Sequence, residues 1–221
     1  MSSKQPEQAS PGSWPASPLR TVVEQLFVGL PVSRYQAKGA AAAVEEPVLG
    51  VSDLGDGLLA PRAGLTKVSL RPDSFDRFRV QAGDILLSCR ATTLKAARVT
   101  EEGTGLIASS NLIVLRPGGR LLPALLLALL RSSPWQELLR LRSRSSTSLI
   151  QLTLRDVEDL PVPLPPSELQ QQLASLIDAE EEHHRCALRA AALRRALVEG
   201  LVSDVLLGPA SAASSRGEDH A

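Results

Sequence analysis

The sequence is poor in aromatic residues and in cysteine. Phe, Trp and Tyr together make up 3% of the 221 residues. Proteins that bind single-stranded nucleic acid stack bases on aromatic side chains, so this scarcity argues against that class. The two cysteines, Cys89 and Cys186, have neither a CxxC partner nor a histidine at ligand spacing. We therefore expect free thiols, without a disulfide framework or a zinc site.

Membrane and targeting segments are also missing. The longest apolar run, residues 121–130, is too short to cross a bilayer and contains Pro123. Residues 1–18 are rich in Ser, Pro and Gln and lack the apolar centre of a signal peptide. We therefore expect a soluble protein of the cytoplasm, with residues 1–18 and 208–221 as disordered tails.

Catalytic signatures are absent as well. The sequence contains no GxxxxGK[ST], GxGxxG, GxSxG or HExxH motif, and no Asn-Pro-Pro-aromatic motif of an amino-methyltransferase. His183 and His184 are adjacent, so on a helix they point about 100° apart, and no third ligand is near in sequence. We expect them to be polar helix residues and expect no bound metal.

Charge is distributed unevenly, although the formal net charge is zero. Residues 1–165 hold 19 Lys and Arg against 15 Asp and Glu, whereas the remaining residues hold 5 against 9. The first part is therefore mildly basic and the second part acidic. A nucleic-acid binder is identified by a local basic surface more than by its total charge, so this distribution is compatible with DNA binding by the first part.

Residues 19–166 contain short elements separated by turns, which predicts a mixed α/β domain. The turn at residues 81–84, for example, precedes an apolar stretch that favours a strand. The expected strands are residues 47–51, 66–70, 85–88 and 105–115. The expected helices are residues 121–131 and 135–141, followed by a short helical step at 155–159 and an extended Pro-rich segment at 160–166. No βαβ regularity is visible, so we expect a curled, irregular mixed sheet.

Residues 167–207 contain one glycine and no proline, and their apolar residues recur at helical spacing. Ser167 suits the N-cap, and Glu168 suits the first turn. A helix of this length is about 60 Å long and cannot bury its apolar stripe on a domain of this size, so it needs a partner helix. The residues expected to face the partner are Leu169, Leu173, Leu176, Ile177, Leu188, Ala191, Val198 and Val202.

The charges of this segment favour one orientation of the partner. Asp178 and residues 180–182 are acidic, whereas Arg194 and Arg195 lie beyond the midpoint. An antiparallel copy would place the acidic half opposite the basic half, and a parallel copy would place like charges together. This pattern favours an antiparallel helix pair. The alternative is a solvated face with ion pairs between residues four apart on one helix.

Three basic clusters are candidates for DNA contact, because cations bind phosphates and planar side chains bind base edges. The alternative for each cluster is a solvated basic loop. Arg142 and Arg144 would share a face if their segment is extended. The candidate residues are Ser33, Arg34, Tyr35 and Lys38; Arg90, Thr92, Thr93, Lys95 and Arg98; and Arg140, Arg142, Arg144, Ser145, Ser146 and Thr147.

Residues 159–170 (DLPVPLPPSELQ) resemble the end of a target-recognition domain in specificity subunits of type I restriction–modification enzymes, where a Pro-rich stretch leads into a long helix. The Glu-Gln pair of the family pattern is displaced here, with Glu168 and Gln170 in its neighbourhood. Residues 80–88 (VQAGDILLS) and 108–115 (ASSNLIVL) are similar to strands of that family, in the same order. The resemblance covers roughly residues 19–207.

The resemblance implies a subunit that recognises double-stranded DNA by sequence and has no catalytic centre of its own. It implies an α+β fold with a tail at residues 1–18, a target-recognition domain at 19–166, a coiled-coil-forming helix at 167–207 and a tail at 208–221. Full family members have two recognition domains and two helices in a pseudo-twofold array. This chain resembles half of one, and it would have to form a homodimer to rebuild the symmetric form.

The resemblance also implies partners that perform the chemistry. These are an adenine-N6 methyltransferase subunit, which would bind S-adenosylmethionine, and a translocase–endonuclease subunit where restriction accompanies methylation. No cofactor is expected on this chain. Two other classes remain open: a non-catalytic adaptor of a DNA-modification or phage-defence complex without base readout, and a small enzyme of unknown type. The lack of clustered acid and base residues in the basic loops argues against the enzyme.

Overall fold

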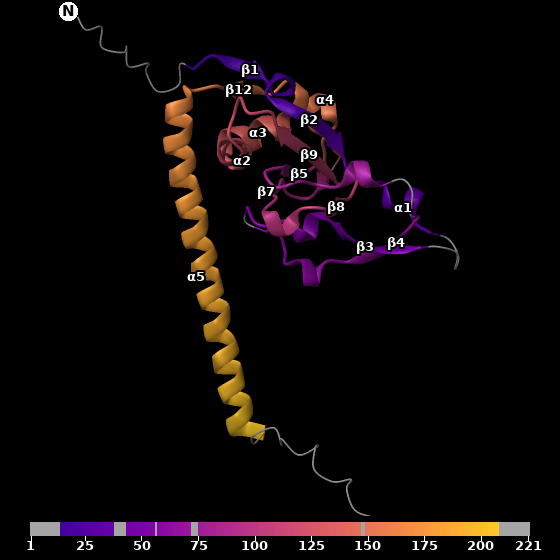
Figure 1. Ribbon diagram of the computed structural model, residues 1–221, viewed down its shortest axis with the longest axis vertical. Coiled ribbons are helices and arrows are strands. Elements are labelled where there is room, and N and C mark those ends of the chain that lie inside the picture. Colours follow the sequence, from indigo (N-terminus) through magenta and orange to yellow (C-terminus); the bar gives the residue numbers. More distant parts are fainter. Residues whose placement is uncertain (1–13, 38–42, 56, 72–74, 147–148, 208–221) are drawn as a thin grey trace, which may run out of the picture. The chain divides into compact units, whose positions relative to one another are not determined.

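The computed structural model describes residues 14–37, 43–55, 57–71, 75–146 and 149–207. The chain divides into two compact units, Met1–Ile177 and Asp178–Ala221. Figure 1 shows the helices and strands of the first unit and the long helix α5 (Ser167–Leu207), which begins in the first unit and continues into the second. The expected class, a mixed α/β domain followed by a long C-terminal helix, is confirmed, and α5 has the expected bounds.

A four-stranded antiparallel sheet forms the centre of the first unit. Its order is β2 (Val23–Val28), β9 (Leu112–Pro117), β5 (Ile85–Ser88) and β7 (Ala96–Arg98). Ile85 and Leu87 pack into one core, and Leu86 between them packs into a second core on the opposite face. The continuous apolar sequence of β5 is explained by this arrangement, because both faces of the sheet are covered.

Helices cover the first face of this sheet. They are α2 (Pro123–Arg131), α3 (Ser133–Arg142) and α4 (Leu154–Glu158). Pro123 and Pro134 occupy the first turns of α2 and α3, where a missing N–H group costs no helical hydrogen bond. Leu126, Leu130 and Leu139 are fully buried in this core, and each contributes about 1.5–3 kcal/mol by leaving water.

The second face carries a smaller sheet of β4 (Lys67–Leu70), β3 (Val44–Leu49) and β8 (Ile107–Ala108), in that order. β3 runs antiparallel to β4 and parallel to β8. Gly29 lies where the chain leaving β2 passes this sheet. A Cβ atom at Gly29 would stand 2.3 Å from the carbonyl oxygen of Ser109, so only glycine fits there.

The remaining elements are short. β6 (Arg90–Ala91), β11 (Leu149–Gln151) and β10 (Arg144–Ser146) form a third sheet, and β1 (Ala16–Pro18) pairs with β12 (Pro161–Pro163). Single turns of helix are α1 (Val32–Tyr35), η1 (Leu19–Thr21), η2 (Val51–Asp53), η3 (Arg62–Gly64), η4 (Asp76–Phe78) and η5 (Glu101–Gly103). Residues 16–18 were expected in a disordered tail and instead form a strand.

Two further expectations need correction. Residues 105–115 were expected to form one strand, but they form β8 and β9, which belong to different sheets. The chain turns between them, where the Leu112 N–H donates to the Ser109 carbonyl at 2.9 Å. The strands of the described residues are also distributed over four small sheets, so the curled, irregular mixed sheet that the sequence suggested is divided rather than continuous.

A buried ion pair connects β9 to the turn before β5. Arg116 donates from Nε and Nη2 to the two carboxylate oxygens of Asp84, at 2.9 and 2.8 Å. The backbone N–H of Gln81 donates to the same carboxylate at 2.8 Å. Asp84 is buried, and its hydrogen bonds raise the pKa of the Arg116 guanidinium above its usual value. The Gly83-Asp84 sequence therefore has a structural role in this sheet.

The first turns of α5 are anchored to the first unit. Gln170 is buried, and its Nε2 donates to the carbonyls of Arg120 and Pro165, both at 3.0 Å. Its Oε1 accepts from the Leu122 N–H at 3.2 Å. Ala174 is buried in the helical core. The displaced Gln of the family-like pattern is thus the residue that fixes the start of the helix.

Candidate nucleic-acid interface

The third sheet brings together basic residues that are far apart in sequence. β11 lies between β10 and β6, and all pairs are antiparallel. Gln151 is paired with Arg144 on one side and with Arg90 on the other. Directly paired residues point to the same face of a sheet, so the three side chains form one row across three strands. All three residues are exposed.

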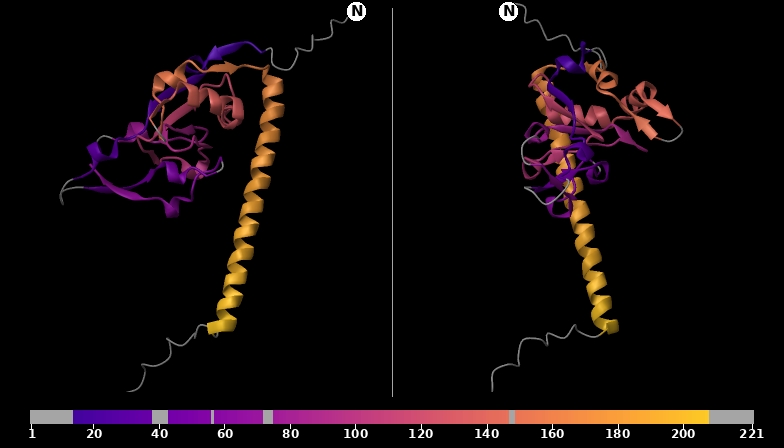
Figure 2. Two further views of the ribbon diagram at one scale, coloured as in Figure 1. Left: turned by 180° about the vertical axis from the view of Figure 1, so that it is seen from behind. Right: turned by 90° about the vertical axis from the view of Figure 1, so that its right-hand side faces the viewer.

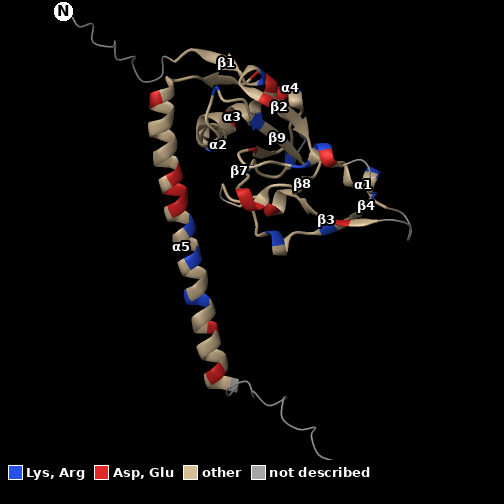
Figure 3. Ribbon diagram, viewed as in Figure 1, with Lys and Arg blue, Asp and Glu red and all other residues tan. Residues whose placement is uncertain are grey.

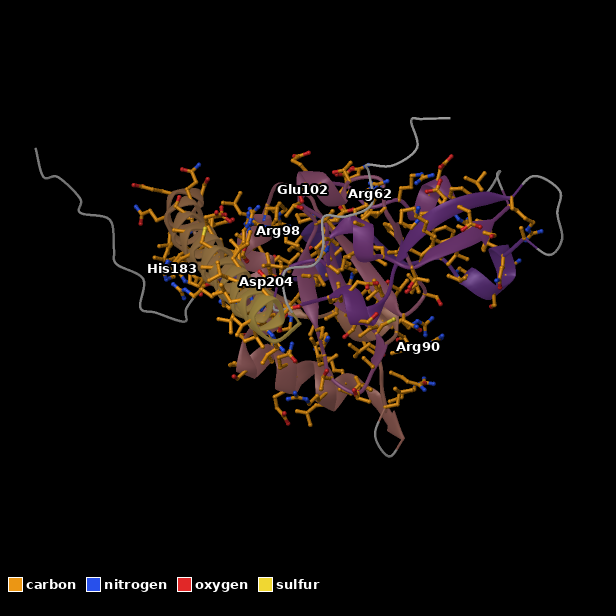
Figure 4. All side chains as sticks on the ribbon, turned by 90° about the horizontal axis from the view of Figure 1, so that it is seen from below. Arg62, Arg90, Arg98, Glu102, His183 and Asp204 are labelled. Atoms are coloured by element: carbon orange, nitrogen blue, oxygen red, sulfur yellow. The ribbon has the colours of Figure 1, made fainter. Side chains whose placement is uncertain are left out.

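The opposite face of this sheet is packed against the domain. Ala91 is buried, and Ile150 packs against the helical core. The Leu152 N–H donates to the Cys89 carbonyl at 2.9 Å, which connects β11 to the end of β5. Burial raises the pKa of the Cys89 thiol, consistent with an inert core cysteine. The exposed row therefore lies on a sheet whose other side is fixed. Figure 4 shows Arg90 beside the β10–β11 hairpin.

The structure separates the members of the second predicted cluster. Arg90, Thr92 and Thr93 are exposed at β6 and in the turn that follows it. Lys95 instead lines a cavity of about 600 Å³, and its Nζ donates to the Leu54 carbonyl at 3.1 Å. Arg98 is half-buried on β7, and Figure 4 shows it on a different side of the domain from Arg90. Three of the five residues thus remain near the exposed row.

The third predicted cluster is divided between a helix and a strand. Arg140 and Arg142 lie in the last turn of α3, whereas Arg144 begins β10. The segment is not extended at Arg142, because α3 continues through that residue, so the condition under which Arg142 and Arg144 would share a face is not met. Arg140 pairs with Glu137 at 3.7 Å, and the Nη1 of half-buried Arg142 donates to the Asp156 carbonyl at 3.5 Å.

Ser145 and Ser146 belong to β10 by their backbone, and Lys38 and Thr147 lie outside the described residues. Arg144 is therefore the member of the third cluster that the structure adds to the exposed row.

A second basic surface surrounds Tyr35. Arg71, the residue after β4, donates from Nη2 to the Arg34 carbonyl at 2.6 Å. Arg77 in η4 donates from Nη2 to the Tyr35 hydroxyl at 3.0 Å and lies over the Phe78 ring. Tyr35 itself packs edge-on against Phe78. Arg34 and Tyr35 were predicted from the sequence, whereas Arg71 and Arg77 were not, because only the fold brings them to α1. We call the surface that Arg34, Arg71 and Arg77 form around Tyr35 the Tyr35 surface.

These arginines differ from the arginines that form ion pairs. Arg79 pairs with Glu46 at 2.7 Å and with Asp76 at 2.9 Å, and the Glu46 hydrogen bond raises its pKa. Arg20 pairs with Asp159. Arg71 and Arg77 are instead held by a carbonyl and a phenol oxygen, which carry no net charge. Their positive charge is therefore not neutralised by the contact that orients them. Figure 3 shows Lys and Arg around α1 and β4.

The predicted helix contacts fall into two groups. Leu173 and Ile177 line an apolar groove of about 300 Å³ in the first unit, together with Trp14, Leu125 and Leu129. Leu169 is half-buried beside them. The other predicted residues, Leu176, Leu188, Ala191, Val198 and Val202, are all exposed. Leu193, Leu197 and Leu201 are exposed too and were missed, although they continue the same helical spacing.

Within the described part of the chain, no three His, Cys, Asp or Glu side chains are grouped as a metal site would require. None of the helices in that part is both long enough and apolar enough to cross a membrane.

Comparisons with known proteins give a consistent result. The family described as "Type I restriction modification DNA specificity domain" matches residues 43–183. No curated protein matches the chain. Among solved structures, the HsdS subunit from Thermoanaerobacter tengcongensis is similar with a TM-score of 0.55 at 21% identity, over 96% of this chain and 53% of that one.

Two further solved structures show the same likeness of fold. The S subunit of a type I restriction-modification system from M. genitalium gives a TM-score of 0.58 at 13% identity, covering 90% of this chain and 47% of that one. A chain from a study of complex assembly and conformational transition of the type I R-M system gives 0.55 at 23% identity, covering 89% and 45%. At these identities the likeness shows the fold. The chain spans about half the length of the chains it matches.

Proposed function

The chain belongs to the family of type I restriction modification DNA specificity domains, and from this premise we propose that it recognises a DNA sequence on behalf of a partner enzyme. The observation that carries the proposal is the exposed row Arg144–Gln151–Arg90, built from segments more than fifty residues apart. Cations and a planar amide on a rigid sheet face are what duplex recognition needs. The Tyr35 surface adds cations that are suited to the phosphate backbone.

Catalysis belongs to partner subunits in this proposal. The partners are an adenine-N6 methyltransferase subunit, which would bind S-adenosylmethionine, and a translocase–endonuclease subunit where restriction accompanies methylation. Support comes from the family and from the absence of catalytic motifs in the sequence. The complex would act on DNA in the cytoplasm. This chain would direct the complex to its DNA sequence and would perform no chemistry of its own.

We propose that α5 pairs with a second copy of the chain. Exposed apolar residues beyond Asp178 support this, because a stable helix of this kind normally buries its stripe. Ile177, His184, Ala191, Val198 and Val205 are spaced by seven residues, so they lie along one face. In an antiparallel pair, the acidic residues 180–182 would lie opposite Arg194 and Arg195 of the second copy. The dimer would then have two identical recognition domains, so its DNA target would be an inverted repeat with a spacer between the two half-sites.

The test of this function is enrichment from a pool of random DNA duplexes. The full chain is incubated with the pool, alone and with a type I methyltransferase subunit from the same source, at two salt concentrations. The expected result is a split, inverted-repeat motif. Binding that depends on salt but enriches no motif would indicate phosphate contacts only. That result, or no binding, would favour an adaptor without base readout.

A further inference from the structure

We propose that Gln151 reads an adenine in the major groove and that the β10–β11 hairpin carries it there. The proposal rests on the DNA-recognition function above and names one specificity-determining residue for it. Gln151 was not among the candidates from the sequence, because nothing in its neighbourhood there marks it out. Its position in the sheet, between two exposed arginines, is what singles it out.

The amide of Gln151 is available for a ligand. In the part of the chain that the structure describes, its side chain makes no hydrogen bond with the protein, and the residue is exposed. Two other glutamines of the domain have structural partners. Gln170 bonds three backbone groups, and Gln136 donates to the Leu130 carbonyl at 2.6 Å. Gln151 thus keeps both its donor and its acceptor free.

The shape of the hairpin suits a groove of DNA. The major groove admits a two-stranded β-ribbon, and β10 and β11 form such a ribbon beyond the row, whereas β6 joins them at the row itself. Figure 2, in its right-hand view, shows the hairpin projecting from the body of the domain. Neighbouring strands lie about 5 Å apart, so the row from Arg144 to Arg90 spans about 10 Å. That length corresponds to about three base-pair steps.

The side-chain chemistry of the row Arg144–Gln151–Arg90 indicates which base it would bind. An amide side chain accepts a hydrogen bond from adenine N6 through Oε1 and donates to adenine N7 through Nε2. This donor and acceptor pair in the major groove identifies adenine alone among the four bases. Arg90 and Arg144 flank the amide and provide the cations that hold the ribbon against the negatively charged groove walls. The inward residues, Ala91 and Ile150, fix the sheet from behind.

The experiment compares the wild-type chain with Gln151→Ala and Gln151→Glu in the random-duplex enrichment. Gln151→Ala is expected to lose one adenine position in each half-site and to weaken binding to the wild-type motif about 5- to 150-fold. Gln151→Glu is expected to change the preference at that position from adenine to cytosine, because a carboxylate accepts from cytosine N4. Gln171→Ala, an exposed glutamine on α5, is the matched control and should keep the motif.

The outcomes separate this proposal from the function on which it rests. If the wild type enriches a motif and Gln151→Ala enriches the same motif with the same adenine, the assignment of Gln151 is overturned while the recognition function stands. Equal weakening on all sequences would also overturn it, since that result indicates a backbone contact. If the wild type enriches no motif, both proposals fail. Because Gln151 is exposed, thermal unfolding of the three variants should match the wild type and exclude a folding defect.

Discussion

Leucine is used in different ways in the two units of this chain. In the first unit, residues such as Leu86 and Leu87 are fully buried in cores on the two sides of one sheet. In the second unit, Leu193 and Leu197 are each 65% exposed. The first unit therefore buries most of its large apolar residues by itself. Within the described part of the second unit, the apolar residues of the helix remain on the surface, which is what the proposed pairing with a second copy would change.

The ion pairs also differ between the two units, in their burial. In the first unit, the Asp84–Arg116 pair is buried and holds strands together. In the second unit, two ion pairs are local ones along the helix, Arg185 with Glu182 and Arg195 with Glu199. Exposed pairs of this kind contribute only about 0.3–0.5 kcal/mol each. They support the helix but cannot replace the burial that its apolar residues lack.

The largest expected effect comes from truncating one leucine in each unit. Leu86→Ala should lower the free energy of unfolding by about 2–5 kcal/mol, because it removes buried methyl groups and leaves a cavity. Leu193→Ala should change it by less than about 0.5 kcal/mol. Denaturation followed by tryptophan fluorescence reports on the first unit alone, since Trp14 and Trp135 both lie there. Equal losses in the two variants would refute the contrast.

A somewhat smaller effect is expected on self-association. Replacing Val198 and Val202 by Asp places charges on the proposed helix interface. The dimer loses two valines from each copy, which costs roughly 3 kcal/mol even if each of the four is only half buried, so dimerisation should weaken about 150-fold or more. Light scattering at tens of micromolar should show a wild-type dimer and a monomeric variant, with the unfolding of the first unit unchanged. A monomeric wild type at that concentration would remove the self-pairing proposal.

The arginines of the first unit offer a third test, with a roughly tenfold effect. Arg71→Ala combined with Arg77→Ala should weaken binding to all duplexes alike, because phosphate contacts carry no sequence information. The dependence of log affinity on log salt should become shallower by about 0.9 for each lost phosphate contact. Arg79→Ala is the matched control, since its guanidinium is occupied by Glu46 and Asp76. An equal loss of DNA affinity in the control would count against the Tyr35 surface.

The sequence predicted the elements whose signal is local. Proline and turn residues delimited α2 and α3, and helical spacing without proline predicted α5 to its observed ends. The apolar run of residues 85–88 was also sufficient to predict the strand β5. The short strands β6, β10 and β11 were missed, because two or three residues carry no periodicity of their own. Their pairing depends on contacts between distant segments.

The candidate site was predicted only in part for the same reason. Arg90, Arg144 and Arg34 were identified from basic clusters, but clusters in sequence did not remain clusters in space. Lys95 bonds a backbone carbonyl at a cavity, whereas Arg71 and Arg77 join Tyr35 from other elements. Gln151 has no local signature at all. Such residues are found only when the register of the strands is known.

The smallest expected effect tests the orientation of the helix pair. Replacing Arg194 and Arg195 by Glu makes α5 acidic in both halves. In an antiparallel pair, each copy would then lose two attractions between these arginines and the acidic residues of the other copy, and like charges would repel in their place. Exposed pairs contribute about 0.2–1 kcal/mol each, so dimerisation should weaken roughly tenfold at low salt. At 1 M salt the difference should nearly vanish, because the screening length falls to about 3 Å. In a parallel pair, these arginines would repel each other, and the same change would leave the affinity unaltered. A loss that persists at high salt would instead indicate that the arginine stems pack in the interface.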